Sequence, residues 1–201
     1  MHRLRNHSSV IIRQRKELAE LFGFETRNKY EISDEKGNLI LYCAEMQKGF
    51  WGFLARQFLG HWRSFELHFF DSQKQPVWRA NHPFRFIFQR LEILANDGHQ
   101  IGTAVWKWAF LRKRYALNNE REGKTFAIES GFFSIWRFPV FHQGQEVGAI
   151  QKKWGGLLKE VLTDADTFQV EFAGHLSEAD RGLILSTAIL VDLTYFERKA
   201  R

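Results

Sequence analysis

The sequence GLILSTAILVDLTYFE, which runs from Gly182 to Glu197, is the most apolar stretch of the chain and lies almost at its end. Ser177 precedes Asp180 by three residues, a capping-box-like pattern that predicts a helix beginning near Ala179 and ending near Phe196. Apolar side chains occupy nearly every face of such a helix, so apolar atoms must surround it. The residues expected in this central helix include Leu183, Ile184, Ile189, Leu190, Asp192 and Phe196.

Two environments meet that requirement, a lipid bilayer and the interior of a protein. From Gly182 to Phe196 a helix is roughly 22 Å long at about 1.5 Å per residue. The hydrocarbon core of a bilayer is thicker, roughly 30 Å, and an aspartate such as Asp192 inside it costs about 2.5 to 3.5 kcal/mol. The sequence therefore favours burial within protein over a single C-terminal transmembrane helix.

Before this helix, alternating apolar strands and polar turns repeat between residues 31 and 154. The expected turns are Ser33–Asn38, Asp71–Gln75, Ala95–Gln100, Asn118–Lys124 and His142–Glu146. Asp, Asn and Gly close tight turns because they tolerate positive φ. Five hairpins give about ten strands, and TFQVEF (Thr167–Phe172) with a segment near the N-terminus brings the number to twelve. A mainly β fold is predicted, an antiparallel barrel closed around the hydrophobic helix.

The N-terminal region is predicted to differ from the rest. Residues 1–9 are basic and are interpreted as a tail, and residues 10–201 as a single domain. A short helix is expected over RKELAELFGF, residues 15–24. The only apolar run near the start, Val10 to Ile12, is too short for a secretory signal.

The chain is basic, with a formal net charge of +6, which favours anionic partners such as lipid head groups or nucleic acid. The single cysteine, Cys43, excludes an intrachain disulfide and a cysteine-rich zinc site. Neither a metal-binding histidine pattern nor a glycine-rich phosphate loop nor a serine elbow occurs, and buried histidines such as His68 are expected to be core residues. The sequence predicts no enzyme.

Three segments in this order resemble the phospholipid scramblase family: ELAELFGFETRNKYEI (residues 17–32), IQKKWGGLLKEVLTDADTFQVEF (150–172) and AILVDLTYFE (188–197). The resemblance covers nearly the whole chain from about Val10. It implies the fold shared with tubby-like and LURP-one-related proteins, a twelve-stranded barrel around a C-terminal helix. It also implies calcium-stimulated, ATP-independent movement of phospholipids between leaflets.

The resemblance places a proposed calcium segment on DADTFQVEFAGH, residues 164–175, with Asp164 and Asp166 as candidate ligands. The remaining positions lack the residues of an EF-hand loop, because Phe168 stands in place of an oxygen ligand. A turn that leads into a strand is the alternative interpretation.

Lipid contact is the second candidate property. Aromatic and basic residues are interleaved in residues 46–63, 82–90, 105–115 and 131–138, a mixture that suits a membrane interface. The candidate residues for lipid or phosphate contact are Lys48, Phe50, Trp51, Arg56, Trp62, Arg63, Lys107, Arg112, Lys113, Arg114, Lys152 and Lys153. The alternative is that many of these aromatics belong to the barrel core and its rims.

Three functions remain open from the sequence. The first is a scramblase-like protein on the cytoplasmic side of an anionic phospholipid membrane. The second is a lipid- or protein-binding module that moves no lipid, and the third is nucleic-acid binding through the basic residues. The sequence makes no prediction about the oligomeric state.

Overall fold

The structure is a computed structural model of the whole chain, and it describes residues 3–15, 28–46, 64–83, 90–109, 112–130, 136–153 and 167–193. The helix predicted over residues 15–24 lies almost entirely outside these ranges, as does Phe196.

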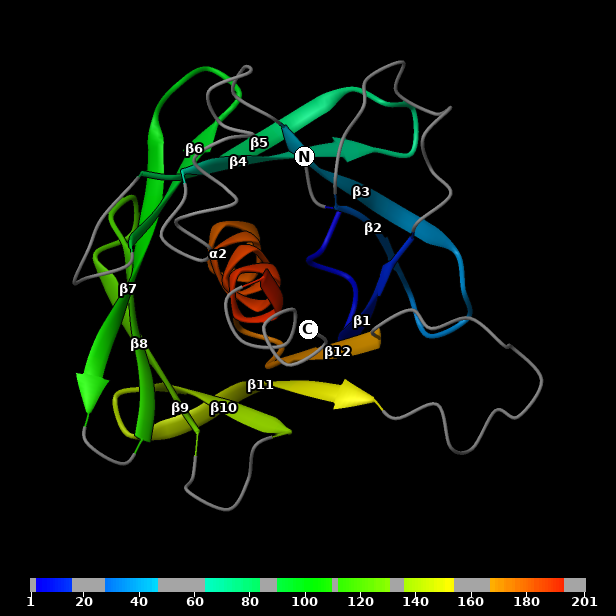
Figure 1. The fold of residues 1–201 in the computed structure, drawn as a ribbon. Helices are drawn as coiled ribbons and strands as arrows, with labels where there is room; N and C mark the ends of the chain where they lie inside the picture. The colour runs from blue at the N-terminus through cyan, green and yellow to red at the C-terminus, as the bar shows by residue number, and fades with distance from the viewer. Residues whose placement is uncertain are drawn as a thin grey trace, which may run out of the picture.

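Twelve antiparallel strands form a closed barrel, as predicted (Figure 1). They are β1 (Ser9–Gln14), β2 (Lys29–Ser33), β3 (Leu39–Met46), β4 (Phe65–Asp71), β5 (Pro76–His82), β6 (Arg90–Ala95), β7 (Gln100–Ala109), β8 (Arg112–Asn119), β9 (Lys124–Ser130), β10 (Arg137–His142), β11 (Gln145–Lys153) and β12 (Thr167–Phe172). Each strand pairs with its neighbours in sequence, and β1 pairs with β12 to close the sheet. Closure leaves no strand with a free edge.

All five predicted turns connect the strands expected to flank them. In the turn after β4, the Asp71 carboxylate accepts hydrogen bonds from the backbone N–H groups of Gln73 and Gln75. Gly37 has a φ of 86°, a conformation that is readily available only without a Cβ. Local hydrogen bonding and glycine therefore fix these reversals, as the composition of the turns indicated.

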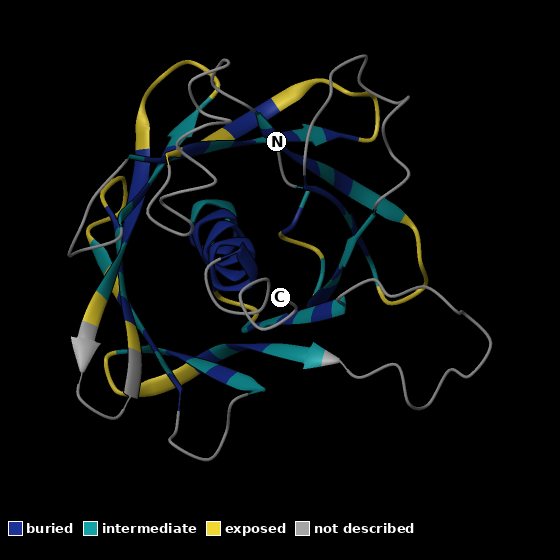
Figure 2. Cartoon of the chain, viewed as in Figure 1, coloured by how far each residue is buried: buried dark blue, intermediate teal, exposed yellow. Residues whose placement is uncertain are grey.

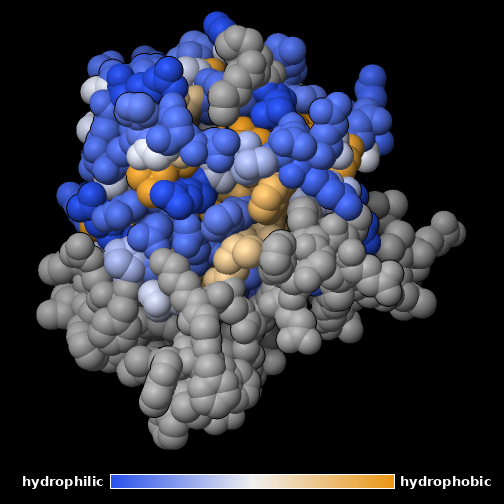
Figure 3. All heavy atoms as spheres, turned by 90° about the horizontal axis from the view of Figure 1, so that it is seen from above, coloured by the Kyte–Doolittle hydropathy of each residue, from blue (hydrophilic) through white to orange (hydrophobic). Residues whose placement is uncertain are grey.

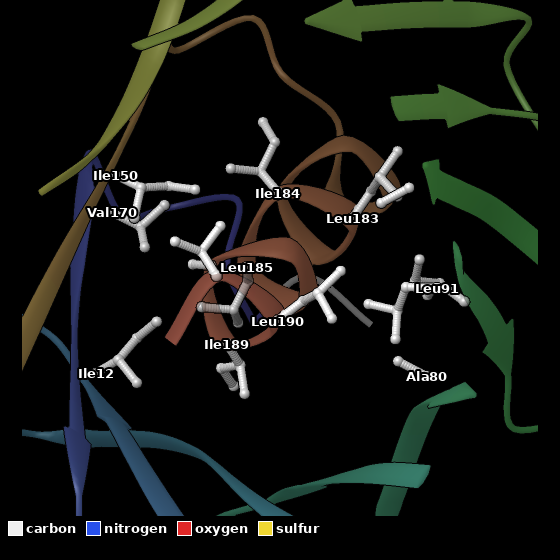
Figure 4. Packing of buried hydrophobic residues seen from close by; sticks show 14 of the residues in the cluster. Ile12, Ala80, Leu91, Ile150, Val170, Leu183, Ile184, Leu185, Ile189 and Leu190 are labelled. Carbon is white, nitrogen blue, oxygen red and sulfur yellow. The ribbon is translucent and has the colours of Figure 1, made fainter. Parts of the chain in front are cut away.

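Helix α2 (Glu178–Val191) runs through the barrel and is buried along nearly its whole length (Figure 2). Its predicted start is confirmed, because the Ser177 hydroxyl accepts from the Asp180 N–H while the Asp180 carboxylate accepts from the Ser177 N–H. Figure 4 shows its apolar side chains pointing outward toward strand residues such as Ile12, Leu91 and Val170. The expected central residues Leu183, Ile184, Ile189 and Leu190 are all buried.

The two ends of the barrel differ in what joins the strands. At one end, here called the turn end, lie the five tight turns and the connection from β12 into α2. At the other end, strands β1, β3, β5, β7, β9 and β11 all terminate, and α2 ends there with Asp192 as its C-cap. This second end is called the C-cap end.

Candidate functional site

The start of α2 is joined to the turn between β8 and β9. Asp180 is fully buried, and its carboxylate accepts hydrogen bonds from Asn119 Nδ2 at 2.6 Å and Lys124 Nζ at 3.0 Å. Burial raises the pKa of Asp180, but the hydrogen bonds from Asn119, Lys124 and Ser177 outweigh burial and hold it below its usual value. The carboxylate is therefore charged near neutral pH and joins the helix to the barrel wall.

The next residue, Arg181, is only 1% exposed although its guanidinium is charged. Burial lowers the pKa of this group, and the nearby Glu178 carboxylate opposes that shift. The guanidinium donates to four backbone carbonyl oxygens, those of Leu4, His7, Ala173 and Leu176. It also lies over the Phe172 ring, 5.0 Å from the centroid. One side chain thus connects the N-terminal segment, the end of β12 and the helix.

Residues 3–9, which the sequence analysis assigned to a basic tail, pack against the barrel. Leu4 is fully buried, and its N–H donates to the Glu178 carboxylate, as does the N–H of Arg5. Residue 9, placed in the tail by the sequence analysis, is the first residue of β1. Residues 3–9 therefore cover the turn end and hold the start of α2. The basic composition gave no sign of this packing, which involves the buried Leu4 and backbone hydrogen bonds to Glu178 and Arg181.

The middle of α2 has one polar contact with the wall. Trp78 Nε1 on β5 donates to the Ser186 hydroxyl at 3.1 Å, and both groups are buried. The Thr187 hydroxyl donates to the Leu183 carbonyl within the helix. These two hydrogen bonds give the Ser186 and Thr187 hydroxyl groups partners inside the apolar interior.

At the C-cap end, Tyr30 on β2 donates its hydroxyl proton to Asp192 Oδ2 at 2.9 Å. Other polar side chains share this end of the interior. Gln14 Nε2 donates to Asn28 Oδ1 at 3.0 Å, and Asn28 Nδ2 donates to Glu45 Oε2 at 2.7 Å. Polar contacts therefore hold α2 at its start, its middle and its end.

The predicted lipid-contact residues that the structure describes lie at the C-cap end. Lys107 on β7 and Arg114 on β8 are directly opposite each other and exposed. Arg114 also forms an ion pair with Glu129 on β9. Arg112, Lys113 and Lys153 occupy the ends of β8 and β11 at the same end. The fold thus gathers residues that are up to 46 positions apart in the sequence.

Lys152, near the end of β11, lies on the inner side of the wall. It pairs in register with Phe168, and its ammonium lies 5.6 Å from the centroid of that ring. Phe168 itself is buried, as are Val170 and Phe172 on the same strand. Lys152 is half-buried and differs from the exposed Lys107.

Several candidate residues fall outside the described ranges. They are Lys48, Phe50, Trp51, Arg56, Trp62, Arg63, Asp164, Asp166 and Phe196. The structure describes the strands that flank these residues. β3 ends and β4 begins at the C-cap end, so residues 47–63 join two strand termini of that end. Residues 84–89 and 131–135 likewise join strands that end and begin at the C-cap end, β5 to β6 and β9 to β10.

The segment proposed to bind calcium runs into a strand. Residues 167–172 form β12, with Phe168 buried inside the barrel. A twelve-residue EF-hand loop requires its middle positions to turn around the ion, which a paired strand cannot do. Asp164 and Asp166 lie outside the described residues and directly precede β12, so both interpretations, a calcium site and a turn that leads into a strand, stay predictions. Among the described residues, no group of three or more His, Cys, Asp or Glu side chains is arranged to hold a metal ion.

Cys43 and two histidines of the barrel wall, His68 and His82, lie in different environments. Cys43 is buried, and burial raises the pKa of its thiol well above the usual value, with a further contribution from Glu45. His68 is not a core residue: it lies on the outer face of β4, 3.2 Å from Glu66. His82 is the histidine that faces the interior, stacked on Phe65 with centroids 4.5 Å apart.

Within the described part of the chain, no helix combines the length and the apolar character that crossing a bilayer requires.

Comparison with known proteins identifies similar sequences over almost the whole chain. A family model described as Scramblase matches residues 1–198. Phospholipid scramblase 1 of Rattus norvegicus is 28% identical over 94% of this chain and 60% of its own length. Phospholipid scramblase 2 of Bos taurus is 30% identical over 94% of this chain and 68% of its own. The chain thus spans about three fifths of the rat protein.

One solved structure, of a protein from Arabidopsis thaliana, aligns with 92% of this chain and 90% of its own at a TM-score of 0.48 and 12% identity.

Proposed function

Because the chain belongs to the scramblase family, we propose that it binds phospholipid membranes and moves phospholipids between leaflets without ATP. The observation that carries this proposal is the extent of the family match, residues 1–198, which includes every strand of the barrel and α2. Moving a lipid breaks no covalent bond, so the proposal requires no catalytic residues.

The proposed association is peripheral and on the cytoplasmic side. The peripheral character of this association is supported by the position of α2, whose apolar surface is covered by the barrel and whose polar groups bond to the wall. Moving α2 into lipid would expose the barrel core and break the contacts of Asp180, Arg181, Ser186 and Asp192. The helix therefore stays inside the barrel while the protein works at the membrane surface.

A retained helix limits how lipids can cross. A polar head group needs a polar path through the hydrocarbon region, and the interior of this barrel is filled by α2 and the strand side chains that face it (Figure 4). The proposed path is therefore outside the barrel, through lipid that the bound protein disturbs locally.

Calcium is proposed as a stimulus of low affinity, of millimolar order by the number of ligands available. The support is the family resemblance together with Asp164 and Asp166, which immediately precede β12. Glu171 lies near the end of β12, away from the residues that precede the strand, and we do not include it as a ligand.

The test is reconstitution of the purified protein into liposomes that contain a fluorescent phospholipid. A reductant added outside quenches the outer leaflet, and scrambling carries the signal below the half that a sealed bilayer protects. We expect this drop with the protein, and a larger one with calcium. A signal that stops near one half, with and without calcium, would contradict lipid movement.

A second candidate function is a lipid-binding module that moves no lipid. The filled interior favours this function, because a closed barrel that retains its helix offers no path for lipid through its interior, and binding at the surface needs none. Co-sedimentation with anionic liposomes, combined with a reductant signal that stops near one half, would identify this function.

A further inference from the structure

The two halves of the barrel carry opposite net charge. Each charged residue in the described ranges belongs to one half, according to its place in the strands. Residues at the midpoint of their strand or nearer to its C-cap terminus, with Arg15 and Asp192, form one half, and the rest form the other.

The C-cap half holds twelve basic residues and six acidic ones. The basic residues are Arg13, Arg15, Lys29, Arg79, Arg90, Lys107, Arg112, Lys113, Arg114, Arg137, Lys152 and Lys153, and the acidic ones are Glu31, Glu45, Glu66, Glu92, Glu129 and Asp192. The turn half holds seven basic residues and ten acidic ones. The basic residues are Arg3, Arg5, Lys36, Lys74, Arg121, Lys124 and Arg181, and the acidic ones are Asp34, Glu35, Asp71, Asp97, Glu120, Glu122, Glu146, Glu171, Glu178 and Asp180.

Ion pairs leave the excess of positive charge at the C-cap end unneutralised. Four acids there are each paired with an arginine: Glu31 with Arg15, Glu66 with Arg79, Glu92 with Arg90 and Glu129 with Arg114. One further arginine, Arg137, pairs with Glu146 of the turn half, which reduces the excess at each end by one charge. Within the described residues, Lys107 has no ion-pair partner, and the cation directly across the sheet from it is Arg114. Like charges placed opposite each other destabilise a sheet, whereas an anionic surface facing both of them relieves the repulsion.

At the turn end the acids are built into the structure. Asp34 and Asp71 close their turns, and Glu178 and Asp180 hold the start of α2. Figure 3 views the barrel from the side, where hydrophilic residues cover most of the described surface and small apolar patches lie between them. The turn end thus combines negative charge with exposed turns, which suits water rather than an anionic surface.

From this polarity we infer that the barrel docks on an anionic phospholipid leaflet with its C-cap end toward the lipid and its turn end toward water. The inference rests on the proposed membrane function and adds the orientation. Opposite net charges on two halves orient a molecule before contact, because the field of the surface attracts one half and repels the other.

A phospholipid surface fits this end better than nucleic acid does. Residues 47–63 join two strands at the C-cap end, and their sequence contains Phe50, Trp51, Phe53, Phe58 and Trp62 but no acidic residue. Aromatic side chains with nearby cations are typical of membrane interfaces. Duplex nucleic acid, bound through its phosphates, requires the cations alone.

The two ends of strand β4 allow a direct test of orientation. Ser64 immediately precedes β4 at the C-cap end, Ser72 immediately follows it at the turn end, and both are exposed. Ser64→Cys and Ser72→Cys can each carry an environment-sensitive fluorophore, because the native Cys43 is buried and its thiol pKa is raised. On vesicles of phosphatidylcholine and phosphatidylserine that contain a nitroxide-labelled lipid, we expect strong quenching at position 64 and little at position 72.

Charge variants provide a second readout with a matched control. Lys107→Glu with Arg114→Gln lowers the net charge by three at the C-cap end, and Lys36→Glu with Arg121→Gln lowers it by the same amount in two exposed turns of the turn end. We expect the first pair to weaken binding to anionic vesicles by about tenfold or more, and the second to change it by less than about threefold. Thermal unfolding checks that both variants remain folded.

The outcomes separate the orientation from the proposed function. If the unmodified protein binds neither anionic nor neutral vesicles, the membrane function itself is wrong, and binding of duplex DNA under the same conditions would replace it. If it binds anionic vesicles but position 72 is quenched as strongly as position 64, or both charge variants lose binding equally, the membrane function stands and the orientation is overturned.

Discussion

The Tyr30 hydroxyl and the Asp192 carboxylate, 162 positions apart in the sequence, form a buried 2.9 Å hydrogen bond at the C-cap end of the barrel. An acidic residue at the C-terminus of a helix faces the negative end of the helix dipole, which is unfavourable. A donor from the barrel wall offsets part of that cost. The bond therefore fixes where α2 ends relative to β2.

We expect Tyr30→Phe to lower the free energy of unfolding by about 1 to 3 kcal/mol, since it removes a donor from a buried carboxylate and little else. Urea denaturation of the variant measures the loss. The matched comparison is the same substitution in an Asp192→Asn background, where the charge is gone and the loss should shrink. Equal losses in both backgrounds would mean that the charge of Asp192 adds nothing to this bond.

Arg181→Met should be more disruptive, because it removes a charged donor from four backbone carbonyls, of which those of Leu4 and Ala173 keep a backbone N–H donor. We expect a loss of about 3 kcal/mol or more, by analogy with breaking a buried charged network. Residues 3–8 should also become accessible to protease, since Leu4 and His7 are bonded through this guanidinium. Arg5→Met is the control, because the exposed Arg5 contributes its backbone N–H to Glu178. Unchanged protection of residues 3–8 in Arg181→Met would contradict the connection.

The fold could be predicted from the sequence because its signals are local and repeated. Alternation in segments such as Thr167–Phe172 marks each strand, Asp and Gly mark the turns, and Ser177 with Asp180 marks the start of α2. The same alternation would have placed His68 correctly. Phe65, Leu67 and Phe69 face inward, so the residue between Leu67 and Phe69 must face outward.

The polar contacts of α2 could not be predicted in this way. In the sequence, Arg181 is indistinguishable from any charged residue near the start of a helix. Its partners are backbone carbonyls, which every residue has and which no sequence pattern indicates. Tyr30 and Asp192 come together only through the register of the closed barrel. The cations at the C-cap end were recognised individually, but their excess over the turn end appears only when the strands are placed side by side.

Gly102 is predicted to be required where β7 approaches β8. A Cβ at this position would lie 2.2 Å from the backbone oxygen of Asn118, and backbone cannot move aside as a side chain can. We expect Gly102→Ala to destabilise the protein by about 1 to 3 kcal/mol, measured by thermal or urea unfolding. Gly174→Ala is the control, because no atom lies within 4 Å of its Cβ and its φ is not positive. A loss at Gly174 as large as that at Gly102 would show that the close approach is not the cause.

Asp180 predicts how stability responds to acid. Its pKa in the folded protein is lowered, because the hydrogen bonds from Asn119, Lys124 and Ser177 outweigh the effect of burial. A group with a depressed folded pKa contributes stability above its unfolded value, near 3.9, and that contribution disappears as the pH falls through the folded pKa. Asp180→Asn should therefore be less stable than the parent at pH 7, by about 1 to 3 kcal/mol.

The difference between the two proteins should narrow below about pH 4, since a protonated aspartate resembles asparagine. Urea unfolding of both proteins from pH 7 down to pH 3 measures this convergence. Parallel stability curves over that range would show that the charge of Asp180 does not hold the start of α2. In that case the neutral capping bonds alone would account for its position.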